Sequence, residues 1–416
     1  MTLGVLILAR LVRPRIASGP DRLLDGALIA ALAVVALQLA PLPPGLRDSI
    51  APSSVAFERA VRIVEPSDAG GPVTVDANAT AYALYIDAVV ILLFWSARRG
   101  FERGGVRRVL RGIAVLGLVV VPLGIGQHLL SPKAFYGEVR PISSSALPFT
   151  PFVNRNDFAA WLLMAVPAVI GYEIARIESR RQAGVGFDPE SAFDNPAMVL
   201  AWSAFAMVAG LLVSLSRSGL TGLIAALGLF LVLARRRTSG QWLRLMALAF
   251  AGMLVLGILF ANADALGSRL SGAVSEGLVG RLDIWRQTWP MVGDFFPVGS
   301  GVGTYQKVMV LYQTSSRRFA ISHADNEYLQ ILAEGGALLA VPAAVAIVGA
   351  AMAIRRRLAA DRTPMYWVRA GAACGVFGMA VQNLFEMTLR VPANAALLAI
   401  LAAVAMHGAP RPAGRS

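Results

Sequence analysis

The sequence has few charged residues for its length. Charged side chains make up 15% of the 416 residues and hydrophobic residues make up 56%, whereas soluble domains carry about 25% charged residues. Apolar runs of roughly 20 residues, the length that crosses a bilayer, recur along the whole chain. The alternating segments of about ten residues that mark an outer-membrane barrel are missing. The sequence therefore predicts an all-α polytopic membrane protein and excludes an ordinary soluble domain.

Cysteine and metal-binding patterns are also scarce. The single cysteine, Cys374, lies in an apolar run, which excludes a disulfide framework. The sequence has no Asp-x-Asp pair, no His/Cys cluster and no HExxH helix. We therefore expect no metal and no cofactor. Residues 1–12 are apolar but too short to span a membrane, and no cleavage site of a signal peptide follows them.

Hydropathy predicts about ten transmembrane helices, with eleven or twelve as the alternative if residues 1–12 belong to a truncated first span. The approximate spans are Leu23–Leu42, Thr80–Ser96, Val109–Leu130, Phe158–Ala175, Ala197–Leu215, Gly219–Ala234, Leu245–Ala261, Tyr328–Ile354, Tyr366–Phe385 and Pro392–His407. They divide the chain into a cytoplasmic or interfacial N-terminal segment (1–22), helices one to seven (23–261), a periplasmic loop (262–326), helices eight to ten (327–408) and a cytoplasmic tail (409–416).

The basic residues indicate the orientation. Short loops on one side of the ten spans hold 24 of the 38 basic residues, and the longer loops on the other side hold 14. Loops rich in arginine stay in the cytoplasm, so the long loop 262–326 is expected to face the periplasm. The net charge of +13 is explained by topology, and we expect no nucleic-acid partner. The aromatic residues of this loop favour packing, with an amphipathic helix from about Leu278 to Val292.

Four arginines at the predicted outer face could bind phosphate. Arg217 stands between two serines at the corner of two apolar spans, where an arginine is costly unless it faces a cavity or partner; the alternative is an interfacial arginine that contacts lipid head groups. Arg281 and Arg286 open the amphipathic segment, and Arg281 could instead pair with Asp283. Arg155 precedes a span whose start Asn156 or Asp157 could cap. Guanidinium groups match phosphate oxygens with two hydrogen bonds, which favours diphosphate binding.

His323 is a candidate general base. It lies just before a span, where Asp325 or Asn326 could cap the helix, and an imidazole titrates near neutrality. The alternative is an ordinary surface histidine. The turn 297–303 resembles a glycine-rich phosphate loop only weakly, and we interpret it as a turn that brings backbone close to a ligand. Glu386 and Arg390 could pair with each other or line the site.

Five motifs together resemble one family, the O-antigen ligase and polymerase superfamily of bacterial membrane glycosyltransferases. They follow one another along the chain as Phe152–Ala159, Ser216–Gly219, Gly280–Trp285 with Pro297–Tyr305, His323–Gln330 and Ala333–Gly336. The resemblance implies a GT-C-like helical fold in the inner membrane and a donor glycan on undecaprenyl diphosphate. It also implies that Arg217 and Arg281 bind the diphosphate. Many members have the histidine immediately before the asparagine, whereas Asp325 stands there in this chain, so His323 either acts alone or acts with Asp325.

The resulting hypothesis is a metal-independent, inverting glycosyltransferase that works on the periplasmic face of the inner membrane. Its partners would be the lipid-linked donor, membrane lipids and an acceptor hydroxyl on lipid A–core or on another glycan chain. No motif separates a ligase from a polymerase. A transporter or flippase of lipid-linked sugars would have polar residues near the bilayer midplane. A non-catalytic component of polysaccharide export is the third alternative, and it leaves the outer arginines unexplained.

Overall fold

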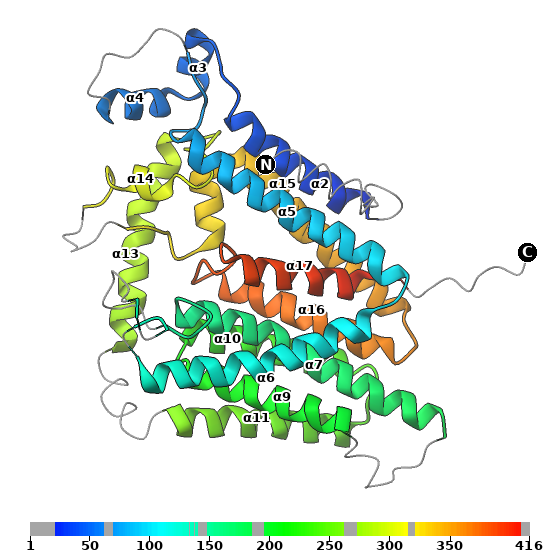
Figure 1. Ribbon diagram of the computed structural model, residues 1–416. Helices are drawn as coiled ribbons and strands as arrows, with labels where there is room; N and C mark the ends of the chain where they lie inside the picture. Colours follow the sequence, from blue (N-terminus) through cyan, green and yellow to red (C-terminus); the bar gives the residue numbers. More distant parts are fainter. Residues whose placement is uncertain are drawn as a thin grey trace, which may run out of the picture. The chain divides into compact units, whose positions relative to one another are not determined.

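The computed structural model is helical throughout the residues that it describes, which are 21–61, 70–132, 134–136, 138–139, 148–184, 195–261, 273–314 and 321–408 (Figure 1). Strands are absent from these ranges, where only isolated bridges occur. The predicted all-α class is confirmed. The N-terminal segment 1–12 and the tail 409–416 lie outside the described residues.

Each of the ten predicted spans coincides with a helix of the structure. Within the part of the chain that the structure describes, five helices are long and apolar enough to cross a membrane, namely α5 (Ala77–Glu102), α6 (Val106–Leu130), α7 (Arg155–Gln182), α10 (Arg217–Ala234) and α15 (Glu327–Ala360). The helical class and the membrane character agree with the sequence, while the number of ten spans stays a prediction.

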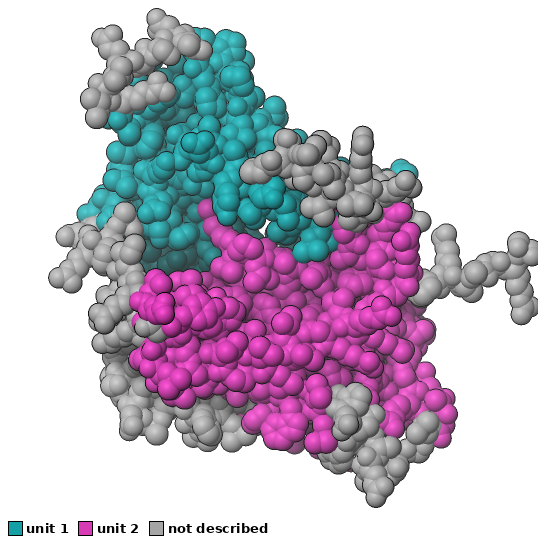
Figure 2. Space-filling view, viewed as in Figure 1, with its two compact units in different colours: residues 1–93, 272–353, 383–387 teal, residues 94–271, 354–382, 388–416 magenta. Residues whose placement is uncertain are grey.

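The chain forms two compact units (Figure 2). Unit 1 comprises residues 1–93, 272–353 and 383–387, and unit 2 comprises residues 94–271, 354–382 and 388–416. Helices α5 and α15 each contribute to both units. The short segment 383–387 belongs to unit 1 although the helices before and after it in the sequence belong to unit 2.

Unit 2 is built around α7, whose residues from Phe158 to Val169 are almost all fully buried. Small residues allow α16 to approach α7 closely. A Cβ atom on Gly371 would lie 2.2 Å from the carbonyl oxygen of Pro167, and one on Gly375 would lie 2.5 Å from that of Met164. Besides α7, this unit contains α6 and α10, together with α9 (Asn195–Val213), α11 (Gly240–Ala261), α16 (Met365–Gln382) and α17 (Pro392–Met406).

Unit 1 contains the segment that carries most of the candidate functional residues. Besides parts of α5 and α15 it holds α2 (Arg22–Gln38), α3 (Pro44–Ile50), α4 (Pro52–Val61), α13 (Ala273–Asp294) and α14 (Tyr305–Met309). Helix α15 bends at Gly336, whose φ of 59° is in the left-handed region. Within this unit, α13 runs across the direction of α2 and α5 (Figure 1). The predicted amphipathic helix therefore exists, and it begins earlier than Leu278.

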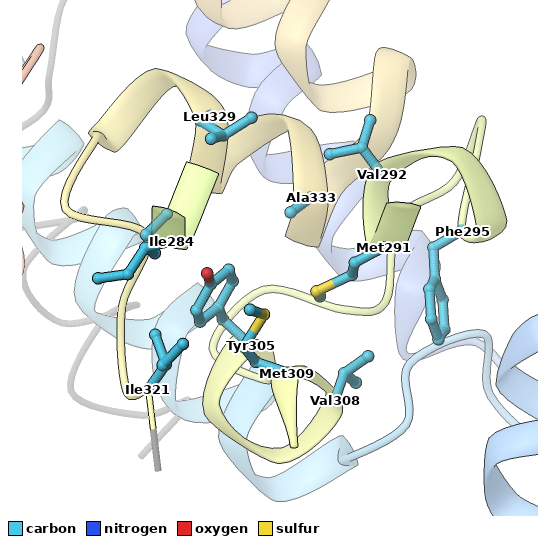
Figure 3. Close-up of a cluster of buried hydrophobic side chains, with 11 residues drawn as sticks. Ile284, Met291, Val292, Phe295, Tyr305, Val308, Met309, Ile321, Leu329 and Ala333 are labelled. Carbon is cyan, nitrogen blue, oxygen red and sulfur yellow. The ribbon is translucent and has the colours of Figure 1, made fainter. Parts of the chain in front are cut away.

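An apolar cluster joins α13, α14 and the start of α15. Figure 3 shows Tyr305 and Met309 between Ile284 on one side and Met291 on the other, with Ala333 above them. Ile284, Met291 and Val292 come from α13, and Phe295 directly follows it. Because these side chains recur at helical spacing, one face of α13 is fixed by burial. This core supports the loop that carries His323.

Candidate functional site

The two arginines of α13 leave the helix on different faces. Five residues separate Arg281 from Arg286, which corresponds to about 140° of rotation at 3.6 residues per turn. Arg281 is half-buried, whereas Arg286 is exposed with Leu282 and Trp289. The structure therefore does not bring Arg281 and Arg286 together.

Arg281 forms an ion pair with Glu386 from the segment 383–387. The carboxylate is the more buried partner, with 9% of its side chain exposed against 25% for the guanidinium. The sequence suggested Asp283 as the partner of Arg281 and Arg390 as a partner of Glu386. The pair of Arg281 with Glu386 joins residues that lie far apart in the chain, which the spacing of charges could not reveal; the other two pairings stay predictions.

The loop before α15 is held on the same side of α13 as Arg281. Trp285, one turn after Arg281, donates a hydrogen bond from Nε1 to the carbonyl oxygen of Ala324 at 2.9 Å. The backbone N–H of Glu327 donates to the carbonyl oxygen of Asn383 at 3.0 Å. The face of α13, the loop 321–326 and the segment 383–387 thus converge on one place in unit 1.

His323 and Asp325 flank the buried Ala324. The His323 side chain is exposed, and its Nδ1 lies 2.8 Å from the hydroxyl oxygen of Ser322. Asp325 adopts a φ of 48°, a left-handed conformation that aspartate tolerates better than most residues. Asn326 caps α15, because its Oδ1 accepts from the N–H of Leu329 at 3.0 Å. Of the two capping candidates, the structure selects Asn326.

The glycine-rich turn 297–303 packs against protein backbone. A Cβ atom on Gly299 would lie 2.2 Å from the carbonyl oxygen of Glu334, and one on Gly336 would lie 2.0 Å from that of Pro297. A Cβ atom on Gly301 would likewise collide, in this case with the side chain of Thr74. The sequence predicts that this turn brings backbone close to a ligand. In the structure, its glycines allow a close approach to α15 and to the residues before α5.

Gln38 fixes the same turn from α2. Its Nε2 donates to the carbonyl oxygens of Val298 at 2.8 Å and Glu334 at 2.9 Å, and its Oε1 accepts from the N–H of Val302 at 3.1 Å. All hydrogen-bonding atoms of this buried carboxamide are used. Gln38 is not among the residues predicted from the sequence. The feature that could have indicated its role is a carboxamide at the end of an otherwise apolar helix.

Tyr305 is a titratable residue that is buried beneath the loop of His323. Its hydroxyl lies 2.7 Å from that of Thr288. Burial raises the pKa of Tyr305 to about 12, and the charges of Asp325 and Glu334 add to this effect. The phenol is therefore neutral at physiological pH and stabilises the core through its hydrogen bond.

Arg155 and Arg217 are the first residues of two helices of unit 2 that touch at their first turns. A Cβ atom on Gly219 of α10 would come within 2.6 Å of the Cβ of Ala159 on α7. Both helix starts are capped. Ser216 Oγ accepts from the N–H of Gly219 at 3.2 Å, and Asn154 Oδ1 accepts from the N–H of Asn156 at 3.0 Å. The expected caps of α7, Asn156 and Asp157, are therefore corrected to Asn154.

This arrangement favours an anion. Helix N-termini carry partial positive charge and unpaired N–H groups, and Arg155 and Arg217 add two full positive charges to neighbouring starts. Arg217 is exposed and Arg155 is half-buried. Gln382 of α16 and Asn394 of α17 hold the first turn of α7 by donating to the carbonyl oxygens of Asn156 at 3.2 Å and Asp157 at 3.1 Å.

Sequence reasoning missed the side chains that hold the backbone. These are Trp285, Gln330, Glu334, Gln382 and Asn394, in addition to Gln38. A metal site would need His, Cys, Asp or Glu side chains in a group, and no group of three or more exists among the described residues.

The chain is thus a helical protein with several apolar helices of membrane-spanning length. Arginines begin α7 and α10, and a histidine lies in the loop before α15. Residues 202–343 match the family model described as O-antigen ligase. The match confirms the resemblance of the chain to the O-antigen ligase and polymerase superfamily. No curated protein matches the sequence.

Proposed function

We propose that the protein transfers a glycan from undecaprenyl diphosphate to an acceptor hydroxyl. The observation that carries this proposal is the O-antigen ligase match over residues 202–343, which includes Arg217, Arg281 and His323. The same stretch contains α10, α13 and the loop before α15. The chemistry of these side chains suits a reaction in which an anionic lipid diphosphate leaves and a hydroxyl attacks.

The proposed reaction is a single displacement at the anomeric carbon. The acceptor oxygen forms a bond to that carbon while the bond from the carbon to the diphosphate oxygen breaks, with inversion at the sugar. The acceptor proton passes to the imidazole of His323, or to the carboxylate of Asp325 if that group is the base. The lipid diphosphate departs with the electron pair of the broken bond. Because the donor already carries the lipid diphosphate as an activated leaving group, the reaction needs no nucleotide.

The family resemblance assigns the diphosphate to Arg217 and Arg281, and we add Arg155, which lies in the same unit as Arg217. Arginines that meet developing negative charge can each contribute roughly 3 kcal/mol to the stability of a transition state. Arg155 and Arg217 stand at touching helix starts, and Arg281 belongs to the face of α13 that holds the loop of His323. Arg286 is left out of this set because it is exposed on another face of α13. With arginines available, the diphosphate needs no metal ion.

The site is assigned to the periplasmic side of the inner membrane because of the distribution of basic residues. A reporter fused after Thr314 should be active only in the periplasm, and one fused after Thr363 only in the cytoplasm. A cytoplasmic signal at Thr314 would place His323 on the wrong side of the membrane for this reaction and would end the proposal.

The decisive experiment is transfer by the purified protein in liposomes. A lipid-linked oligosaccharide is supplied with either lipid A–core or a second copy of the glycan as acceptor, in the presence of EDTA and without nucleotide. Transfer to lipid A–core identifies a ligase, and chain elongation identifies a polymerase. Movement of the donor across the bilayer without transfer would support a flippase instead. Absence of both activities, with donor still bound, would support a non-catalytic role.

A further inference from the structure

Ala324 is held at both of its backbone polar groups by side chains from different helices. Its N–H donates to Gln330 Oε1 of α15 at 2.8 Å, and its carbonyl oxygen accepts from Trp285 Nε1 of α13 at 2.9 Å. Ala324 is fully buried in the apolar cluster of unit 1. The residues on either side of it, His323 and Asp325, are the two candidates for the base. Their backbone is therefore fixed from two directions.

Gln330 is part of a longer buried chain of hydrogen bonds. Its Nε2 donates to Glu334 Oε1 at 3.1 Å, and the same carboxylate oxygen accepts from the N–H of Tyr305 at 3.0 Å. Gln330 and Glu334 are four residues apart, so they lie on one face of the first part of α15. The exposed fractions of these two residues are 0% and 1%. This series of hydrogen bonds connects the start of α14 to the loop of His323.

The series of hydrogen bonds is also fixed at Glu334, the end that lies furthest from His323. Gln38 donates to the carbonyl oxygen of Glu334 at 2.9 Å, so the backbone that carries this carboxylate is held by α2. Buried polar groups without partners are costly, whereas a satisfied network specifies one arrangement. Displacement of any one group would leave another buried group without its partner.

We propose that Gln330 and Glu334 are positioning residues that set the backbone of His323 and Asp325 for proton removal from the acceptor. The proposal rests on the proposed transfer reaction, and it adds two residues that touch neither substrate nor reacting atoms. Each hydrogen bond in the chain has a direction. Glu334 accepts from two N–H donors, while Gln330 accepts from Ala324 and donates to Glu334.

This directionality makes the proposal testable by exchange of the two side chains. With Gln330→Glu alone, two carboxylates face each other and the donor to position 334 is lost. With Glu334→Gln alone, the carboxamide oxygen can still accept from Tyr305 and from Gln330, but both hydrogen bonds lose the strength that a charged acceptor gives them, and an additional N–H₂ group is buried beside them. With both substitutions, the new carboxylate accepts from Ala324, and the new carboxamide accepts from Tyr305 and donates to position 330. Every hydrogen bond of the chain can then be remade.

The experiment measures transfer rate, donor binding and loop position in wild type, the two single variants and the double variant. Each single variant should lower kcat at least tenfold with the Kd for the donor changed less than threefold, and the double variant should recover most of kcat. Gln306→Glu, on an exposed position of α14, is the matched control and should behave like wild type. Wild-type transfer itself tests the proposed function, so its absence is distinguished from failure of the positioning role.

Loop position is read without turnover from the labelling rate of a thiol introduced by His323→Cys. The one native cysteine, Cys374, is buried, which keeps background labelling low. The rate should change several-fold in each single variant and return in the double variant. Unchanged kcat in the single variants would overturn the proposal. It would also be overturned if the double variant regained thermal stability and labelling rate but not kcat.

Discussion

Arg281 on α13 is ion-paired with Glu386, which lies 105 residues further along the chain. The pair ties the segment 383–387 to the helix that also holds Ala324 through Trp285. The carboxylate balances the arginine in this structure and limits the directions in which its guanidinium can point. A diphosphate that binds Arg281 must therefore share the guanidinium with Glu386 or displace it.

Glu386→Gln should lower the transfer rate about tenfold, since one hydrogen bond to a charged group contributes on the order of 1.5–3 kcal/mol. The exchange of both charges, Arg281→Glu with Glu386→Arg, should restore the melting temperature lost in either single variant. It should not restore transfer, because the positive charge has left α13. Recovery of both properties in the exchanged protein would show that the pair has only a structural role. Liposome transfer assays and thermal melts measure the two effects separately.

Much of the fold could be predicted because it follows from hydrophobic periodicity. The apolar stretches of the sequence became helices, and the amphipathic pattern after Gly280 became α13. The role of the turn 297–303 could not be predicted in the same way. Its glycines signal a close approach of backbone, but the sequence does not say to what, and the structure shows that the partner is the backbone of Glu334 and Gly335.

The candidate site could be predicted only where charge was the signal. Arg217 is recognisable as a costly charge at the edge of an apolar span, and Arg155 as a charge at the junction of a polar segment and a span. Helical rotation separated Arg281 from Arg286, and this difference becomes visible only when the buried face of α13 is known. Carboxamides such as Gln330 give no sequence signal of their importance, because their hydrogen bonds join residues whose proximity depends on the tertiary structure.

His323→Ala should lower the transfer rate by about 10²–10⁴, the usual contribution of a general base. Donor binding should remain, because the base contacts the acceptor and not the diphosphate. Ser322→Ala, which removes the hydroxyl 2.8 Å from Nδ1, is the matched control and should reduce the rate less than tenfold. If His323→Ala keeps more than roughly a tenth of the rate, Asp325→Asn becomes the next variant to assay. Single-turnover kinetics and donor-binding titrations make this distinction.

Arg217→Lys should reduce turnover by about 10²–10³, comparable to the loss of one donor that stabilises a transition-state anion. Lysine keeps the charge but loses the planar pair of N–H donors that fits phosphate oxygens. Arg155→Lys should act in the same direction and weaken donor binding. Arg286→Lys, on the exposed side of α13, is the control. Equal losses in Arg217→Lys and Arg286→Lys would contradict the assignment of the diphosphate to Arg217.

Gly336→Ala should destabilise unit 1 strongly. Gly336 has a φ of 59°, and an added Cβ would lie 2.0 Å from the carbonyl oxygen of Pro297, so the turn and α15 would have to move apart. Left-handed backbone alone costs a non-glycine residue about 1–3 kcal/mol. Gly293→Ala is the matched control because nothing lies within 4 Å of its added Cβ. Melting temperatures in detergent should fall for the first variant and not for the second; equal values would contradict the observed packing.

Tyr305 should make the protein sensitive to alkali. Burial raises the pKa of this phenol from 10.0 to about 12, so folding favours its neutral form. That contribution to the free energy of unfolding is complete below about pH 10, shrinks as the pH rises and is lost above about pH 12. Tyr305→Phe should lower stability at pH 8 by about 1 kcal/mol through loss of the hydrogen bond to Thr288. It should also make the melting temperature fall less steeply between pH 10 and 12 than in wild type.

The control for this measurement is Tyr136→Phe, since 63% of Tyr136 is exposed. Its curve of melting temperature against pH should run parallel to that of wild type, because this substitution leaves the buried pair of Tyr305 and Thr288 intact. Tyr312, whose pKa burial also raises, remains in both variants, so only the difference between each variant and wild type is interpreted. If the Tyr305→Phe curve is also parallel to wild type, the phenol is not buried as a neutral group, and the core beneath the His323 loop must be more open to water than the structure shows.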